Sequence, residues 1–384
     1  MRYPVVGIEL FCGCGGFSTG FLDAGIRIAA GFDVDRRAIE AYNYNHSYRG
    51  SRGFVSDLSK AAGPELLGLA GISKADFLVA GPPCQPFSIV GKRLGSADRR
   101  ADMIHHFVRL VDEVKPSAFI FENVPNLSRI DGGQLLDQLI FELNGLGYRV
   151  TSKILAAADF GVPQVRRRLL MIGARDRVLA FPQETHGESD LPRRRLKPFV
   201  TAHEVLDDLP PAGDFGECNV FNHEPTEHTP DMLSRLAKLK PGERETGSFH
   251  DRLHPDRPSF TLRAGTGNFS PLRPIHYRYN RVVTVRESAR LQGFNDEFIW
   301  PDWIPRLQQY RQVGNAVPPL LAAVIARSIA RQLGWQRDAP SLRGDSRNRA
   351  PAITMSDEER RELRRRRIRG ASLGLSARRS QELS

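Results

Sequence analysis

The sequence predicts an α/β protein built on a doubly wound, mostly parallel sheet, with a smaller, loop-rich second region. Three observations carry this prediction. Short apolar runs alternate with amphipathic stretches up to about residue 175, which is the rhythm of strands joined by crossover helices. Pro, His, Arg and Gly replace that rhythm from residue 181, and an apolar helical pattern returns at residues 318–333.

The elements of the first region follow from apolar periodicity. Short apolar runs predict strands, and stretches with apolar residues three and four positions apart predict the helices between them. Pro116 ends one helix just before a strand, because proline cannot continue a helix. The expected strands cover residues 5–11, 27–32, 54–56, 77–80, 118–122 and 169–173, and the expected helices cover residues 16–24, 36–43, 104–114 and 133–144.

The chain divides into four expected parts. Residues 1–180 should form the first domain, and residues 181–307, called here the loop-rich region, a second domain and its hinge. Residues 308–335 should end in a helix that rejoins the first domain, since two prolines stand at its start. Residues 336–384 hold 13 arginines, no lysine and seven acidic residues, which predicts a basic, disordered tail.

Composition bounds the possible partners. The net charge of +11 and the pI of about 9.8 favour a polyanionic partner, but the tail alone contributes +6, so charge by itself is weak evidence. The sequence contains no run of about 18 apolar residues, so it predicts no membrane span. Four cysteines in 384 residues make no disulfide framework, which favours a reducing compartment. The pair at positions 12 and 14 has no accompanying ligand cluster, so no metal is expected.

A glycine-rich turn follows the first expected strand. In Phe11-Cys12-Gly13-Cys14-Gly15-Gly16 the glycines let a ligand approach the backbone, and the helix that follows favours an anion at its N-terminus. Ser18 stands where the dinucleotide-binding pattern needs a glycine, so a dinucleotide fits poorly. Asp33 ends the second strand, where a carboxylate can bind a ribose, and Asp57 follows the third. These features indicate a nucleoside cofactor.

Three polar groups come at strand ends further along. Cys84, in Gly81-Pro82-Pro83-Cys84-Gln85-Pro86-Phe87-Ser88, follows an apolar strand and so lies where open α/β sheets bind ligands. A lone cysteine is more often inert core, but Glu122 ends the next strong strand at the same sheet edge. The run Gln164-Val165-Arg166-Arg167-Arg168 precedes another strand. Together they indicate a catalytic site with Cys84 as its nucleophile.

In content and order these motifs resemble those of the DNA cytosine-C5 methyltransferase family. The resemblance begins at the glycine turn and spans residues 8 to about 333. Glu9 departs from the aspartate that many members carry, and residues 181–255 match nothing in the family pattern. Besides the turn and the Cys84 loop, the matching motifs are Glu122-Asn123-Val124, then Gln164 with Arg166 and Arg168, then Arg286-Glu287-Ser288-Ala289-Arg290-Leu291-Gln292-Gly293-Phe294 and Gln312-Val313-Gly314-Asn315-Ala316-Val317-Pro318-Pro319.

The resemblance implies methyl transfer from S-adenosylmethionine to carbon 5 of cytosine in a specific double-stranded DNA sequence. Carbon 5 is a poor nucleophile, and addition of the Cys84 thiolate to carbon 6 would make it enamine-like. Glu122 would be the acid on the N3 side of the ring. Arg168, with Arg166 as a second candidate, would bind the O2 edge or hold the cysteine loop. The cytosine must flip out of the duplex, because a stacked base cannot be reached from both ring faces.

The same resemblance assigns binding residues. Phe11 would stack on the adenine of S-adenosylmethionine, Asp33 would bind its ribose and Asp57 its amino group. Residues 85–103 would cover the flipped base, and the loop-rich region would read the target sequence. The expected cofactor-binding residues are Phe11, Gly13, Gly15, Gly16, Asp33, Val34, Asp57, Leu58, Pro82, Asn315 and Val317. The expected DNA-binding residues are Gln85, Ser88, Lys92, Arg93 and Gln164.

Three other functions fit part of the pattern. A transfer-RNA cytosine methyltransferase would share the chemistry, although the sizeable loop-rich region favours sequence-specific DNA. A catalytically silent DNA-binding relative would not need Cys84, Glu122 and Arg168 together, and a nicotinamide dehydrogenase is disfavoured by Ser18. We expect a monomer in the bacterial cytoplasm, bound to DNA there, and leave open a cognate restriction endonuclease encoded nearby. The target sequence cannot be derived from the chain.

Overall fold

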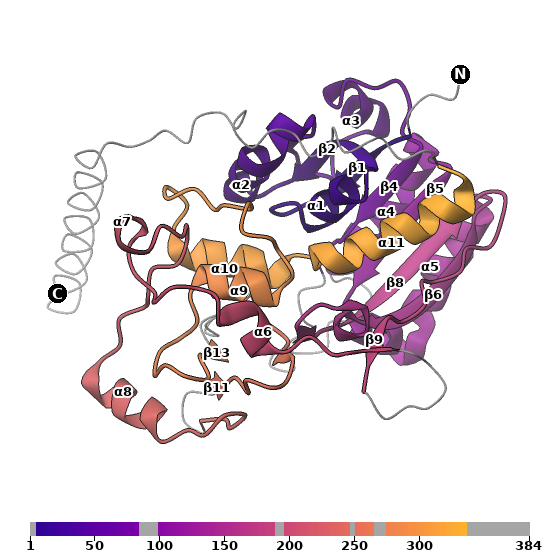
Figure 1. The fold of residues 1–384 in the computed structure, drawn as a ribbon. Coiled ribbons are helices and arrows are strands. Elements are labelled where there is room, and N and C mark those ends of the chain that lie inside the picture. Colours follow the sequence, from indigo (N-terminus) through magenta and orange to yellow (C-terminus); the bar gives the residue numbers. More distant parts are fainter. Residues whose placement is uncertain (1–4, 84–98, 189–195, 246–249, 265–273, 336–384) are drawn as a thin grey trace, which may run out of the picture. The chain divides into compact units, whose positions relative to one another are not determined.

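A seven-stranded sheet organises the chain, with strand order β3-β2-β1-β4-β5-β8-β6 (Figure 1). Neighbouring strands are parallel except at β5–β8 and β8–β6, which are antiparallel. The predicted mostly parallel, doubly wound α/β fold is therefore confirmed. The strands are β1 (Val6–Leu10), β2 (Arg27–Asp33), β3 (Arg52–Val55), β4 (Phe77–Ala80), β5 (Ala118–Asn123), β6 (Arg149–Ala156) and β8 (Arg167–Ala174).

The computed structural model describes residues 5–83, 99–188, 196–245, 250–264 and 274–335. These residues belong to one compact unit, residues 1–346. The expected tail, residues 336–384, lies outside the described residues. So do Cys84 and four expected DNA-binding residues, which are Gln85, Ser88, Lys92 and Arg93.

Helices cover both faces of the sheet because the strands alternate their apolar side chains. On β5, Phe119 and Phe121 join the core beneath α3, α4 and α5, while Ala118 and Ile120 join the core beneath α1 and α11. Such two-sided burial is what makes the strands read as continuous apolar runs. The helices around the sheet are α1 (Gly16–Asp23), α2 (Arg36–His46), α3 (Gly63–Leu69), α4 (Arg99–Val114), α5 (Gln134–Gly145) and α11 (Pro319–Leu333), with 3-10 turns η1 (Ser47–Arg49), η2 (Pro125–Gly133) and η3 (Ala157–Phe160).

The last described helix returns to the sheet as predicted. Helix α11 begins at Pro319, and its apolar residues Leu321, Ile325 and Ile329 are buried in the core shared with α1. One described stretch, Arg306–Leu333, has the length and composition to cross a membrane, but 72% of its apolar window is buried in the protein. Buried core helices pass the same test, and this stretch is interrupted between α10 and α11. It therefore gives only weak support for a membrane span.

In the residues that the structure describes, the elements between β8 and α11 are ten residues long or shorter, as expected for the loop-rich region. Its own core centres on Trp300, which is fully buried among Phe294, Phe298 and Tyr310. The boundaries at residues 180 and 307 stay predictions. The short elements, including one strand before β8, are β7 (Gln164–Val165), β9 (His186–Gly187), β10 (Lys197–Pro198), α6 (Ala202–Leu206), α7 (Phe215–Cys218), α8 (Pro230–Ala237), β11 (Asp251–Arg252), β12 (Ser259–Phe260), β13 (Pro274–Ile275), α9 (Val285–Leu291) and α10 (Arg306–Asn315).

Candidate active site at the carboxyl edge of the sheet

The strand order reverses between β1 and β4, and the two loops predicted to carry function leave the sheet at that point. Strand β1 ends at Leu10 and leads into the glycine turn, while β4 ends at Ala80 and leads into the loop of Cys84. The Gly81 amide donates to the Leu10 carbonyl over 3.4 Å, so the two loops start side by side. Open α/β sheets bind ligands at such a reversal.

The glycine turn has the backbone that its sequence implies. Phe11 and Gly13 adopt positive φ angles of 55° and 54°, and Gly15, at 92°, precedes α1. A Cβ at Gly15 would meet the His46 ring at 2.5 Å, so both conformation and space require glycine there. A Cβ at Gly13 would meet nothing within 4 Å, which leaves one side of the turn open to a ligand.

Gly16 has a packing role that the sequence did not predict. A Cβ at Gly16 would lie 2.3 Å from the Val317 carbonyl oxygen, so the start of α1 is pressed against the segment that leads into α11. Val317 is 6% exposed, whereas Asn315 in the same segment is exposed. The turn is therefore in contact with Val317, one of the two expected C-terminal cofactor residues.

Replacing Gly16 by alanine is expected to lower the free energy of unfolding by about 1–3 kcal/mol, because the added methyl group meets backbone rather than a movable side chain. The matched control is Gly68→Ala in α3, where a Cβ would meet nothing within 4 Å and alanine should leave stability unchanged or raise it slightly. Urea unfolding of both variants checks this. Equal stabilities would show that the close approach at Gly16 is unimportant.

Two carboxylates lie at neighbouring strand ends, where they were predicted. Asp33 accepts hydrogen bonds from the Gly13 amide at 2.8 Å and the Asp35 amide at 2.9 Å, and burial raises its pKa. Val34 beside it is 72% exposed, an unusual setting for an apolar side chain. Asp57 follows β3, and its hydrogen bonds with Ser59 and then Lys60 hold its pKa below the usual value. Leu58 is buried in the core.

A buried hydrogen-bond network beneath the glycine turn was not predicted. Glu9 is 2% exposed, and its carboxyl accepts hydrogen bonds from the amide of Ser18, at 2.9 Å, and from the Ser18 hydroxyl. The Ser18 hydroxyl also contacts Tyr42 at 2.7 Å, and the Tyr42 hydroxyl contacts Ser51 at 2.7 Å. Ser18 thus anchors the start of α1. The sequence does contain one sign of this network, because Glu9 is a charged residue inside an otherwise apolar strand.

The stability of the fold should depend on the protonation of Glu9. Burial raises the pKa of Glu9 to about 8, against about 4.3 for an exposed glutamate. The folded chain therefore keeps a proton that the unfolded chain releases, and the free energy of unfolding should fall as pH rises from about 4.5 to 8. Glu9→Gln resembles the protonated acid and should lack this part of the pH dependence. Urea unfolding of both proteins between pH 5 and 8 checks this, and identical slopes would contradict it.

Glu122 and Arg168 form an ion pair across the β5–β8 ladder. The Arg168 Nε lies 2.8 Å from the Glu122 Oε1, with both side chains largely buried. A Cβ at Gly81 would lie 3.6 Å from the other Glu122 oxygen, so the carboxylate stands beside the start of the cysteine loop. Asn123 donates to the Pro82 carbonyl at 3.3 Å and holds that loop at its base. The structure thus brings the predicted acid and arginine together, next to the residues that lead into Cys84.

Arg166 and Gln164 have other surroundings than predicted. Gln164 is fully buried, and its amide bonds with Leu291, Gln292 and Leu262, so it cannot contact DNA in this conformation. The guanidinium of Arg166 is also buried and donates to backbone carbonyls, and it lies close enough to Glu122 and Arg168 to interact electrostatically with both. The roles expected of Gln164 and Arg166 at DNA and at the base stay predictions, and the structure adds a second role for both, because a polar motif residue can also bind a buried backbone.

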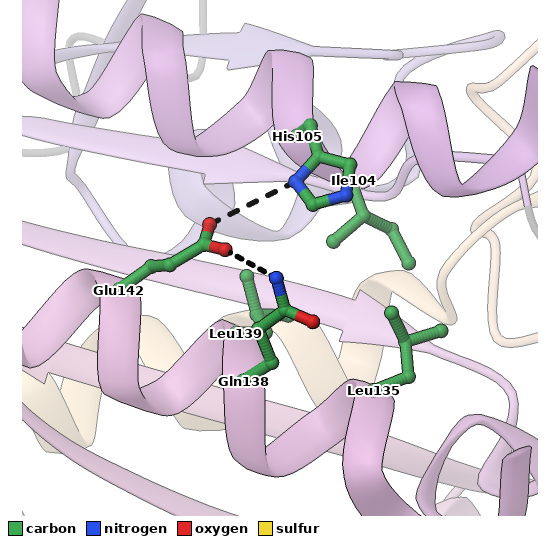
Figure 2. Close-up of a pocket in the computed structure, with 6 residues that line it drawn as sticks. All are labelled: Ile104, His105, Leu135, Gln138, Leu139 and Glu142. Atoms are coloured by element: carbon green, nitrogen blue, oxygen red, sulfur yellow. Dashed lines mark hydrogen bonds and ion pairs between the residues drawn. The ribbon is translucent and has the colours of Figure 1, made fainter. Parts of the chain in front are cut away.

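No metal site is evident in the part of the chain that the structure describes, where no three His, Cys, Asp or Glu side chains form a group suited to a metal ion. Figure 2 shows a hollow between α4 and α5 in which His105 lies 3.8 Å from Glu142, and Gln138 donates to the same carboxylate at 2.9 Å. Its lining contains none of the expected site residues. This hollow is therefore separate from the carboxyl edge of the sheet.

Known proteins resemble this chain in sequence and in fold. The model of the C-5 cytosine-specific DNA methylase family matches residues 5–331. The Type II methyltransferase M.XorII of Xanthomonas oryzae pv. oryzae is 35% identical over 88% of this chain and 87% of its own, and M1.HphI of Haemophilus parahaemolyticus is 33% identical over 84% and 86%. A putative DNA modification methyltransferase encoded within an E. coli prophage superposes with a TM-score of 0.69 at 26% identity, covering 86% of this chain and 99% of the other.

A more distant solved structure supports the fold alone. The S. pombe Dnmt2 methyltransferase has a TM-score of 0.63 at 18% identity, covering 86% of this chain and 99% of its own. The family model and the curated relatives, which cover most of both chains, decide the assignment. The chain belongs to the C-5 cytosine-specific DNA methylase family and is a DNA cytosine-5 methyltransferase.

Proposed function

We propose that this enzyme methylates carbon 5 of cytosine within a specific double-stranded DNA sequence, using S-adenosylmethionine and a covalent adduct between Cys84 and carbon 6 of a flipped-out base. The observation that carries the proposal is the Glu122–Arg168 pair at 2.8 Å beside Gly81 and Pro82. It supplies an acid and a cation at the position where the chain turns toward Cys84.

The β1–β2 edge fits the proposed cofactor. The turn is open at Gly13, the Asp33 carboxylate is held by two backbone amides, and the exposed Val34 offers an apolar surface for an adenine ring. Phe11 and Asp57 would complete the nucleoside site, with Leu58 supporting Asp57 and Pro82 closing the β4 side. Bound there, S-adenosylmethionine supplies an activated methyl group to carbon 5 of the cytosine. Asn315 and Val317 would complete the site from the α10–α11 connection.

The protein's own residues prepare the base. The Cys84 thiolate adds to carbon 6, the C5–C6 double bond opens, and its electron pair moves toward carbon 5 and the N3 side of the ring. Glu122 donates a hydrogen bond or a proton at N3, so that negative charge does not build up there. Arg168 holds Glu122 and provides a donor for the O2 edge. After methyl transfer, loss of the C5 proton restores the double bond and expels Cys84.

Double-stranded DNA is the substrate we favour over transfer RNA, because the Type II methyltransferases M.XorII and M1.HphI match most of the chain at 35% and 33% identity. These relatives also make a cognate restriction endonuclease a plausible partner encoded nearby. We further propose that the enzyme acts as a monomer in the bacterial cytoplasm. The loop-rich region would read the target sequence, together with residues 85–103.

Conversion sequencing of bacterial DNA tests the substrate and the target site together. A host without its own cytosine methylation would express the wild-type gene, and unmethylated cytosines in its DNA would then be converted and read. We expect protected cytosines at one short recurring sequence, with none in cells that express Cys84→Ala. Transfer RNA from the same cells would be converted and read in the same way, and protection found there alone would establish the transfer-RNA alternative.

A further inference from the structure

Buried polar side chains tie the strand of Arg168 to residues 314–317, called here the connecting segment, which comprise the last two residues of α10 and the first two that follow it. Arg166 lies two residues before Arg168 and is 1% exposed. Its two terminal nitrogens donate to three backbone carbonyls, and two of the three belong to the connecting segment. The acceptors are the oxygens of Leu262 at 3.1 Å, Gly314 at 2.9 Å and Ala316 at 3.3 Å.

Gln292 also holds the connecting segment, and Gln164 in turn holds Gln292. Gln292, at the end of α9, is fully buried and donates to the Ala316 carbonyl at 2.6 Å. Its oxygen accepts from Gln164 at 2.6 Å, and Gln164 in turn accepts the Leu262 amide at 3.0 Å. Arg166 and Gln292 therefore share the Ala316 carbonyl as an acceptor, and Gln164 supports Gln292. These three residues are called here the polar hub.

Packing alone does not account for this arrangement. A buried guanidinium costs far more desolvation energy than an apolar side chain of the same volume, and its hydrogen bonds only partly offset that cost. Within the described residues the side-chain hydrogen bonds of Arg166 all go to carbonyl oxygens of chain segments distant in sequence. What such bonds provide, and an apolar residue cannot, is a fixed backbone position for the segment.

The fixed segment contacts the predicted cofactor site. The held carbonyls of Gly314 and Ala316 alternate with Asn315 and Val317, and the Val317 carbonyl is pressed against Gly16 at the start of α1. A shift of the segment would therefore move two expected cofactor residues and the end of the glycine turn together. At its other end the hub is continuous with β8, whose Arg168 binds Glu122.

We propose that Arg166, supported by Gln164 and Gln292, is a positioning residue that holds the connecting segment in the place required for binding S-adenosylmethionine. The inference rests on the proposed function, since Asn315 and Val317 matter here only as part of that cofactor site. It assigns Arg166 an indirect role in cofactor affinity rather than a contact with the base.

The alternative is that the hub only stabilises the fold, and Arg252 provides a matched control. Arg252 is 4% exposed and likewise donates to backbone carbonyls, but all of them lie in the loop-rich region. In both arginines, Nε is buried without a hydrogen-bond partner among the described residues. Replacement of either by lysine keeps the charge and removes the fork of donors. The two variants should lose similar stability.

The experiment measures S-adenosylmethionine binding to the full-length enzyme by calorimetry without DNA, and then the steady-state constants with DNA. Arg166→Lys should bind S-adenosylmethionine about tenfold more weakly. A tenfold loss corresponds to roughly the free energy that one buried hydrogen bond contributes. Its KM for S-adenosylmethionine should rise while its KM for DNA stays within about twofold. Arg252→Lys should bind the cofactor as wild type does.

The inference is overturned if Arg166→Lys binds the cofactor like wild type, or if Arg252→Lys weakens binding as much. If Arg166→Lys does not fold, Gln292→Met, which removes only the donation to Ala316 and the link to Gln164, is judged by the same criteria. Absence of binding by the wild-type enzyme would instead refute the proposed use of S-adenosylmethionine. The two failures are therefore distinguishable.

Discussion

Replacing Cys84 by serine is expected to lower the rate of DNA methylation by roughly three orders of magnitude or more. A serine hydroxyl is not ionised near neutral pH and does not add to carbon 6, so carbon 5 stays a poor nucleophile. Incorporation of labelled methyl groups from S-adenosylmethionine into duplex DNA measures the loss. Cofactor binding should be unchanged, because the effect is on the chemical step alone.

The control for this prediction is Cys218→Ser. Cys218 is a half-buried free cysteine at the end of α7, in the loop-rich region. It should retain close to full activity, which would show that the loss belongs to position 84 rather than to any cysteine. A Cys84→Ser enzyme with more than a few per cent of wild-type activity would remove covalent addition from the mechanism.

Replacing Glu122 by glutamine is expected to lower the methylation rate by about a hundred- to ten-thousandfold, the usual contribution of a positioned acid. The amide keeps the size of the side chain and a hydrogen-bond donor, but it cannot supply a proton at N3. Affinity for DNA and for S-adenosylmethionine should change little, so the loss should appear in kcat. Single-turnover rates at saturating DNA and cofactor separate the two effects.

A second arginine–glutamate pair serves as the control for Glu122. In α4, Glu113 lies 2.8 Å from Arg109 and also accepts the Gly63 amide at 2.6 Å. Glu113→Gln weakens a comparable ion pair away from the carboxyl edge and should leave the rate near that of wild type. If the two variants lost activity equally, the effect of Glu122 would be one of folding, and its role as the acid would have to be abandoned.

The sheet was predictable because its chemistry is visible in the sequence. Strands β2 and β4 are apolar on both faces, and such runs leave few alternatives to a buried parallel strand. Helix α11 shows a clear apolar periodicity that begins at two prolines, and its start was predicted within one residue. The Glu122–Arg168 contact was predictable only by combining strand ends with motif order, since the two residues lie on neighbouring antiparallel strands.

The elements that were missed lack an apolar pattern for physical reasons. Strand β6 is the outermost of the sheet, and most of its side chains are exposed or half-buried, so it carries no apolar run. Helix α9 buries Arg286 and Glu287 along with its apolar residues, which removes the contrast between a polar and an apolar face. Burial of Glu287 acts to raise its pKa, but the hydrogen bonds and charge of Arg281 outweigh this and hold the pKa low.

The roles of Gln164 and Arg166 could not be predicted for a different reason. A sequence gives the donors of a side chain but not the acceptors that the fold brings to them. The acceptors of Arg166 are the Leu262 carbonyl and the connecting segment, and those of Gln164 are the Leu291 carbonyl and the Gln292 side chain. All of them lie 96 or more residues further along the chain. The motif was recognised correctly, and only the assignment of its members to base, DNA or backbone required the structure.

Covalent trapping on DNA that contains 5-fluorocytosine at the target site tests the central claim most directly. Fluorine cannot leave carbon 5 as the proton does, so the adduct should persist after methyl transfer. We expect a denaturation-resistant complex of wild-type enzyme and DNA that requires S-adenosylmethionine, with the cross-link on the peptide that contains Cys84. Absence of the complex at the sequence the enzyme methylates, a cross-link on another residue, or trapping by Cys84→Ala would contradict it.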